Sequence, residues 1–169
     1  MGELKSLGYV KVQSSDLPRW RRFAFDVLGF AEGSGPDEGA LYLRMDERAA
    51  RIIVVPGDTD KVVTVGWEVR DHAALDRVKS ALDAAGVAVK ELSLHEADAR
   101  RVEEVIAFDD PAGTSVEVFH GAALDHSPVV TPFGARFVTG DQGLGAGRGC
   151  AVPAHGRTRC TNHRGARGC

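Results

Sequence analysis

The strongest constraint on the fold is an order of strands and helices that occurs twice along the chain. The first copy opens with a predicted strand at residues 7–12, where aromatic and β-branched side chains favour extended backbone. Asp16 then caps a predicted helix, Pro18 lies in its first turn, and Gly29 is placed to end it. The apolar stripe of that helix is formed by Leu17, Trp20, Phe23, Val27 and Leu28.

Three further strands complete the first copy. We expect a short strand at residues 30–33, followed by strands at 40–45 and 51–55. The last of these is a nearly continuous apolar run, which is typical of a buried strand. The turn residues Pro-Gly-Asp at 56–58 end it. The first copy therefore has the order β-α-β-β-β.

The second copy repeats this order. A predicted strand at 62–69 precedes a helix that Asp71 caps and Gly86 ends. One face of that helix carries Ala74, Leu75, Val78, Leu82 and Ala85. We expect a polar loop or a single helical turn at 95–101. The three remaining predicted strands lie at 87–92, 105–108 and 114–119.

Two such modules, at about residues 5–57 and 60–121, predict an α+β domain. A single module leaves sheet edges and an apolar helix face uncovered, and pairing two modules covers both. We therefore expect a curved, mixed, eight-stranded sheet with the two helices outside. Its half-open inner face is a natural place for a ligand. We assign this domain to residues 1–138 and a linker to 139–145.

Charge is unevenly distributed along the chain. Residues 146–169 contain five arginines and no acidic residue, and removing these five from the 21 Lys and Arg leaves 16 against 24 Asp and Glu, a net charge of −8. An acidic body without a basic face offers no footprint for nucleic acid. No apolar run reaches the length of a membrane span, and the first residues lack a signal-peptide pattern. We expect a cytoplasmic protein with neither nucleic acid nor membrane as a partner.

Seven segments carry a resemblance to a known family. They are Ser6–Tyr9, Gly39–Asp46, Arg51–Gly57, Gly66–Glu68, Phe108–Gly113, Val116–Gly121, and Arg136–Gly140 with Gln142 and Gly143. The last two are the most specific. Together they resemble the extradiol ring-cleavage dioxygenases of the vicinal oxygen chelate superfamily, which open dihydroxybiphenyl and seco-steroid catechol rings. The resemblance runs from about Ser6 to Gly145, which corresponds to the N-terminal domain of such an enzyme and its linker.

The resemblance implies a two-domain enzyme whose catalytic metal is Fe(II), with an aromatic catechol as substrate. Two His and one Glu of the C-terminal domain would hold the iron, and this ligand set leaves adjacent positions open for the catechol oxygens and O2. In that family the first His directly follows Gln-Gly-x-Gly, whereas Ala146 occupies that position here. We therefore expect no catalytic residues, no metal ligands and no bound cofactor in this chain.

The paired modules allow the family's metal positions to be projected onto this domain. They fall on Tyr9, Thr64 and Glu117, of which only the carboxylate binds divalent ions well. We interpret Glu117 as a polar residue with a protein partner inside or at the rim of the sheet.

The remaining candidate metal ligands are histidines and cysteines. His72, His95, His120 and His126 show no partner at metal-ligand spacing, and we expect a surface or interface position for His120. Cys150, His155, Cys160, His163 and Cys169 lack the two tight pairs of a zinc site. Because residues 146–169 contain almost no bulky apolar side chain, we interpret them as disordered. A shift of reading frame after Gly145 would explain their composition.

Three functions remain open on the sequence. The first is the N-terminal half of an iron-dependent extradiol dioxygenase for a biaryl or steroid-derived catechol, inactive alone. The second is a stand-alone module that dimerises and binds an aromatic ligand in the cup of the sheet, which quenching of Trp20 and Trp67 fluorescence would report. The third is a glyoxalase-like, metal-dependent lyase or isomerase. We also expect an exposed surface at 133–137, which could support a homo-oligomer.

Overall fold

The computed structural model describes residues 3–131, which contain eight strands and four helical segments. The first module consists of β1 (Leu4–Ser14), α1 (Leu17–Arg22), the π-helical turn η1 (Phe23–Leu28), β2 (Ala31–Glu32), β3 (Leu41–Arg44) and β4 (Ile52–Pro56). The second consists of β5 (Lys61–Val69), α2 (His72–Ala84), β6 (Lys90–Glu91), α3 (Leu94–Asp98), β7 (Val102–Asp109) and β8 (Ser115–Ala122). The predicted linker, the tail at 146–169 and the surface at 133–137 lie outside the described residues.

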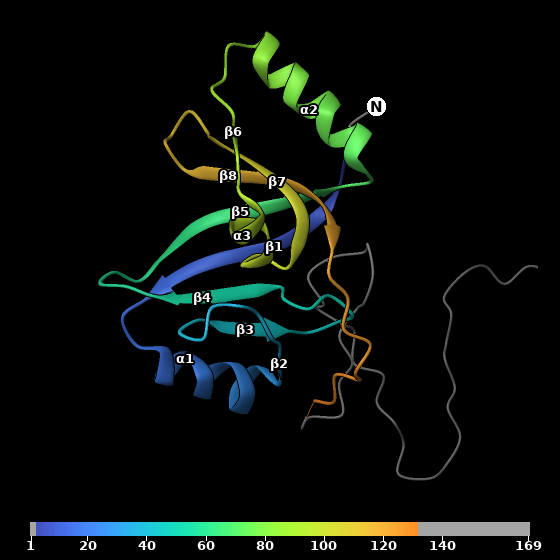
Figure 1. The fold of residues 1–169 in the computed structure, drawn as a ribbon. Coiled ribbons are helices and arrows are strands. Elements are labelled where there is room, and N and C mark those ends of the chain that lie inside the picture. The colour runs from blue at the N-terminus through green and yellow to red at the C-terminus, as the bar shows by residue number, and fades with distance from the viewer. Residues whose placement is uncertain (1–2, 132–169) are drawn as a thin grey trace, which may run out of the picture.

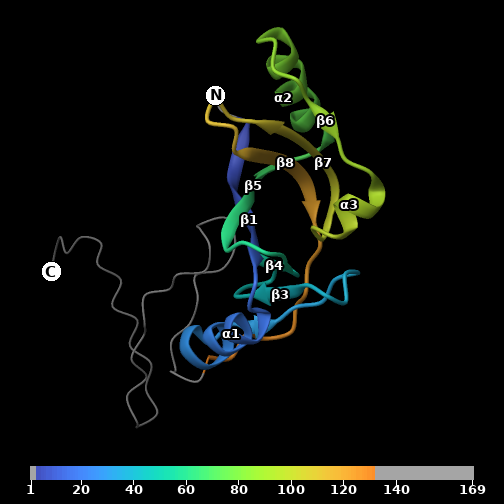
Figure 2. The ribbon, with the colours of Figure 1, turned by 90° about the vertical axis from the view of Figure 1, so that its left-hand side faces the viewer.

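All eight strands form one sheet in the order β2-β3-β4-β1-β5-β8-β7-β6 (Figure 1). Within each module the first strand runs parallel to the last, as β1 does to β4 and β5 to β8. The modules meet where β1 and β5 pair in antiparallel orientation. The sheet is mixed, curved and open at its two ends (Figure 2). The predicted α+β fold of two paired modules is therefore confirmed.

Helices α1 and α2 cover the same face of the sheet, which we call the outer face. The α1–η1 segment packs Leu17, Trp20 and Ala24 against apolar residues of β3 and β4. Helix α2 packs Ala74 and Leu75 against Val69, Ile106 and Val118, the second core cluster of this face. The expectation of two helices outside the sheet is correct. Among the described residues, no helix combines the length and apolar character that crossing a membrane requires.

The opposite face, which we call the inner face, is partly covered by α3. Ala97 of this helix packs with Tyr9, Val105 and Phe119, whose side chains point away from α2. The sequence predicted only a polar loop or one helical turn here. A capping box explains the helix, because the Ser93 hydroxyl accepts from the backbone N–H of Glu96 while the Glu96 carboxylate accepts from that of Ser93.

The capping box gives an expected acid response. Its backbone and side-chain hydrogen bonds to Ser93 lower the pKa of Glu96 from 4.5 to about 2. Because the folded pKa lies below the unfolded value, this stabilisation is present above pH 4.5 and is lost as the pH falls toward 2. The free energy of unfolding of Glu96→Gln, measured with urea, should therefore be lower than that of the parent chain at pH 7. This difference should shrink by pH 2.5. A difference that stays constant over this range would contradict the assignment.

Two elements depart from the prediction, a helix in its hydrogen-bonding pattern and a strand in its length. The first helix changes to π-helical hydrogen bonding at Phe23, and Gly29 ends it in the left-handed region at φ 70° as predicted. The predicted strand at 87–92 pairs only over Lys90–Glu91. Val89, just before it, packs against the α2 cluster instead of continuing the strand. A short strand at the edge of a sheet also limits unwanted pairing with other chains.

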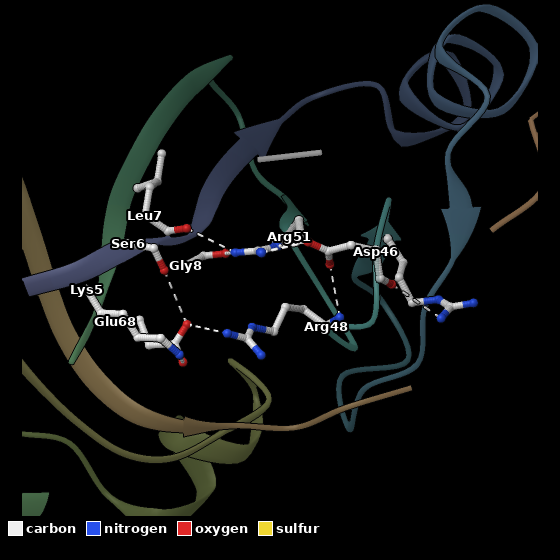
Figure 3. Close-up of polar contacts among 9 residues, drawn as sticks. Lys5, Ser6, Leu7, Gly8, Asp46, Arg48, Arg51 and Glu68 are labelled. Atoms are coloured by element: carbon white, nitrogen blue, oxygen red, sulfur yellow. Dashed lines mark hydrogen bonds and ion pairs between the residues drawn. The ribbon is translucent and has the colours of Figure 1, made fainter. Parts of the chain in front are cut away.

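A buried ion pair holds the loop between β3 and β4 against β1 (Figure 3). Arg51 donates to Asp46 from Nε at 2.8 Å and from Nη2 at 2.6 Å. Its Nη1 donates to the backbone carbonyls of Leu7 at 3.0 Å and Gly8 at 2.8 Å. Both charged side chains are fully buried, at 0% exposure. Arg51 therefore joins this loop to the β1 backbone at the point where the pairing of β1 with β5 shifts its register.

A second ion pair connects the two modules next to the first. Arg48, from the same loop, donates from Nη2 to Glu68 of β5 at 2.7 Å. Ser6 and Lys5 of β1 contact the same carboxylate at 3.4 Å (Figure 3). Since Glu68 is buried, these contacts compensate for the loss of water around its charge.

Candidate functional site

The centre of the inner face carries a buried network of Tyr9, Glu117 and Arg100. Tyr9 comes from β1 and Glu117 from β8, and Arg100 follows α3. Arg100 donates to Glu117 from Nε and from Nη2, both at 2.6 Å, and the Tyr9 hydroxyl donates to the same carboxylate. Arg100 also donates from Nη1 to the Glu96 carbonyl at 2.8 Å. Both carboxylate oxygens of Glu117 therefore have protein donors, as the sequence interpretation expected.

The electrostatics of this network favour a neutral phenol beside a paired carboxylate. Burial raises the pKa of Tyr9 well above its ordinary value, and the negative charge of Glu117 raises it further. The bidentate guanidinium compensates the charge of Glu117, whose side chain is 3% exposed. The network therefore fixes β1 and β8 to the segment after α3 without offering a free anionic ligand.

Thr64 completes the three positions projected from the family's metal site. Its hydroxyl donates to the backbone carbonyl of Ser115 at 2.8 Å, and the residue is buried. A protonated phenol, a threonine hydroxyl and a carboxylate already bound to arginine do not match the two imidazoles and one carboxylate of the family's Fe(II) site. The residues at the projected positions therefore do not fit iron.

Aromatic packing fills the space around this network. Tyr9 stacks on Phe119 with ring centroids 5.0 Å apart, and Gly8 and Gly66 provide the room. A Cβ atom at Gly66 would lie 2.4 Å from the Tyr9 ring. The cavity next to this stack measures about 10 Å³, which suits one water molecule rather than an aromatic ring. Trp20 and Trp67, proposed as reporters of a bound aromatic ligand, pack in the outer-face clusters instead.

A second polar cluster lies on the outer face beside the start of α2. It contains His72, the first residue of α2, with Glu104 of β7 and His120 of β8. Glu104 and His120 are directly opposite each other in the β7–β8 pairing. Glu104 Oε2 lies 2.7 Å from His72 Nδ1 and 2.9 Å from His120 Nε2. The sequence showed no partner at metal-ligand spacing for these two histidines; the fold gives them a shared neighbour, Glu104, because it joins residues that are far apart in sequence.

The three side chains differ in exposure. His120 is 13% exposed, Glu104 42% and His72 63%, so the cluster opens from the sheet toward solvent. The hydrogen bond to Glu104, followed by the charge of Asp76, raises the pKa of His72. Partial burial acts to raise the pKa of Glu104, but its bonds to the two imidazoles outweigh this and lower it. His95 lies on α3 and His126 follows β8, so neither belongs to this cluster.

Comparisons with known proteins place the domain in a family. Residues 7–57 match the family model described as dihydroxybiphenyl dioxygenase BphC D1. An iron-dependent extradiol dioxygenase of Rhodococcus jostii (strain RHA1) is 48% identical over 142 residues, which cover 84% of this chain and 47% of the relative. A biphenyl-2,3-diol 1,2-dioxygenase of Paraburkholderia xenovorans (strain LB400) is 38% identical over 144 residues, covering 84% of this chain and 48% of the relative.

A solved structure agrees with these sequence relatives. The crystal structure of a catechol 2,3-dioxygenase superposes with a TM-score of 0.79 at 32% identity, and the match covers 84% of this chain and 51% of that one. The chain thus spans about half the length of the relatives it matches. The matched half carries the paired modules described above. The chain therefore contains an extradiol dioxygenase N-terminal domain of the vicinal oxygen chelate fold.

Proposed function

We propose that this chain is the N-terminal half of an iron-dependent extradiol dioxygenase that cleaves a biaryl or steroid-derived catechol with O2 in aromatic catabolism. The observation that carries the proposal is the inner-face network of Tyr9, Glu117 and Arg100. Tyr9 and Glu117 occupy two of the three positions where a catalytic module pair would hold iron, and Arg100 already binds the carboxylate. The similarity to about half of each relative supports the same assignment. We expect the enzyme to work in the cytoplasm.

In the whole enzyme, Fe(II) on two His and one Glu of the other half would bind the catechol oxygens and O2. The present domain would contribute a rigid partner for that half. The buried ion pairs of Arg51 and Arg100, which connect loops to the central strands, would supply this rigidity. The role we propose for residues 3–131 is therefore structural support of the active half.

The proposal predicts a clear outcome for the full chain alone. The chain, incubated anaerobically with Fe(II) and then mixed with biphenyl-2,3-diol and air, should form no yellow ring-cleavage product. The P. xenovorans relative, named as a biphenyl-2,3-diol 1,2-dioxygenase and prepared in the same way, is the positive control. Product formed by this chain at a rate comparable to the control would show that it supplies its own catalytic iron ligands. That result would overturn the proposal.

A further inference from the structure

The outer-face cluster has the donor set of a transition-metal site. Two imidazoles and one carboxylate place their ligand atoms within 4.8 Å of one another. Imidazole and carboxylate are ordinary ligands of Zn²⁺, which is usually four-coordinate in proteins. We propose that His72, Glu104 and His120 bind a divalent transition metal ion, with Zn²⁺ as the fitting example, and that water completes its coordination.

The distances in the cluster suit a metal with little rearrangement. Ligand atoms around tetrahedral zinc, with bonds of about 2.0–2.1 Å, lie roughly 3.3 Å apart. The two imidazole nitrogens lie 2.7 and 2.9 Å from one oxygen of Glu104. To admit an ion, these two distances to Glu104 have to lengthen by roughly half an ångström, and the exposed His72 side chain at the helix start can make this shift.

The second ring nitrogen of each histidine also has a carboxylate neighbour. His72 Nε2 lies 3.3 Å from Asp76 Oδ2, and His120 Nδ1 lies 3.7 Å from Glu103 Oε2. Carboxylates behind metal-binding histidines orient the ring and strengthen the donor nitrogen. Asp76 lies close enough to orient the His72 ring in this way, whereas Glu103, at 3.7 Å, is a charged neighbour of His120 beyond hydrogen-bond distance.

The position of the cluster separates it from the iron site of the family. His120 follows Phe119 in β8, and adjacent side chains of a strand point to opposite faces. Phe119 packs with Tyr9 on the inner face, while His120 lies beside α2 on the outer face. A metal here would connect the start of α2 to β7 and β8. A hollow of about 540 Å³ adjoins the cluster, bordered by Leu92, Ser93 and Leu94. This proposal departs from the sequence expectation that the chain binds no metal.

The test is zinc binding by the full chain without an affinity tag. Cys150, Cys160 and Cys169 are replaced by Ser, and His155 and His163 by Asn, in every sample because these residue types also bind zinc. Calorimetry and metal analysis after dialysis should give one Zn²⁺ per chain, and the melting temperature should rise with zinc concentration. His72→Asn, Glu104→Gln and His120→Asn should each weaken binding by at least roughly 100-fold, since second-shell changes alone cost 10–100-fold.

His95→Asn and His126→Asn are the matched controls, because both histidines lie outside the cluster. They should keep the affinity of the parent chain, and circular dichroism should show that all five variants remain folded. Three outcomes would overturn the proposal. They are the absence of stoichiometric zinc, binding unchanged in all three cluster variants, and an equal loss of binding in the two controls.

Discussion

Arg51→Met should lower the free energy of unfolding by about 3–5 kcal/mol, the usual cost of removing one partner of a buried ion pair. The change leaves the Asp46 carboxylate buried without a cation and removes the donor to the carbonyls of Leu7 and Gly8. Urea unfolding followed by tryptophan fluorescence measures the loss. Combining Arg51→Met with Asp46→Ala should recover part of it, because the unpaired buried charge is then gone.

Arg21→Met is the matched control for this prediction. Arg21 makes an equally short ion pair with Glu32, at 2.6 Å, but both side chains are 53% exposed. Exposed pairs typically contribute about 0–1 kcal/mol. If Arg51→Met were no more destabilising than Arg21→Met, the buried pair would not be the anchor of β1 that its geometry indicates.

Arg100→Met should lower the free energy of unfolding by about 3 kcal/mol, near the lower end of the range for buried pairs because Arg100 is 11% exposed. The variant leaves Glu117 on the inner face with the Tyr9 hydroxyl but without its cation. Arg100→Lys should lose less, since the charge remains and only the bidentate geometry is lost. Equilibrium urea unfolding of both variants measures the two losses.

Arg77→Met is the control here, because its pair with Glu3 is on the surface, with side-chain exposures of 58% and 36%. A loss for Arg100→Met equal to that of the control would mean that the inner-face network is not structural. Equal losses for the Lys and Met variants would instead show that the bidentate geometry, and not the charge, is what stabilises Glu117.

Most of the fold could be predicted because its signals are local. Asp71 and Gly86 bound α2, and the apolar stripes identify the outer-face helices without reference to the rest of the chain. The short strand β6 was predicted too long, since β-propensity at Val87 and Val89 does not reveal which neighbour their side chains pack against. An error in the length of one strand leaves the predicted order of strands and helices unchanged. The pairing of the two modules depends only on that order.

The inner-face network and the outer-face histidine cluster could be predicted only in part, because strand pairing brings their residues together from distant parts of the sequence. Glu117 was identified from the module repeat, but Arg100 lay in a predicted loop with no signal that it would reach a strand. His72 and His120 are 48 positions apart in the chain, and only the β7–β8 register places Glu104 between them. The β7–β8 register, which sets Glu104 opposite His120, together with the position of His72 at the start of α2, could have indicated this cluster.

We propose that this domain supports an iron-binding half that the described residues do not provide. Ring cleavage by a chimera that joins residues 1–145 of this chain to the second half of the P. xenovorans biphenyl-2,3-diol 1,2-dioxygenase tests this role. The chimera should bind iron and convert biphenyl-2,3-diol to the yellow product, while the 169-residue chain should not. A folded, iron-loaded chimera without activity, or activity in the chain by itself, would contradict it.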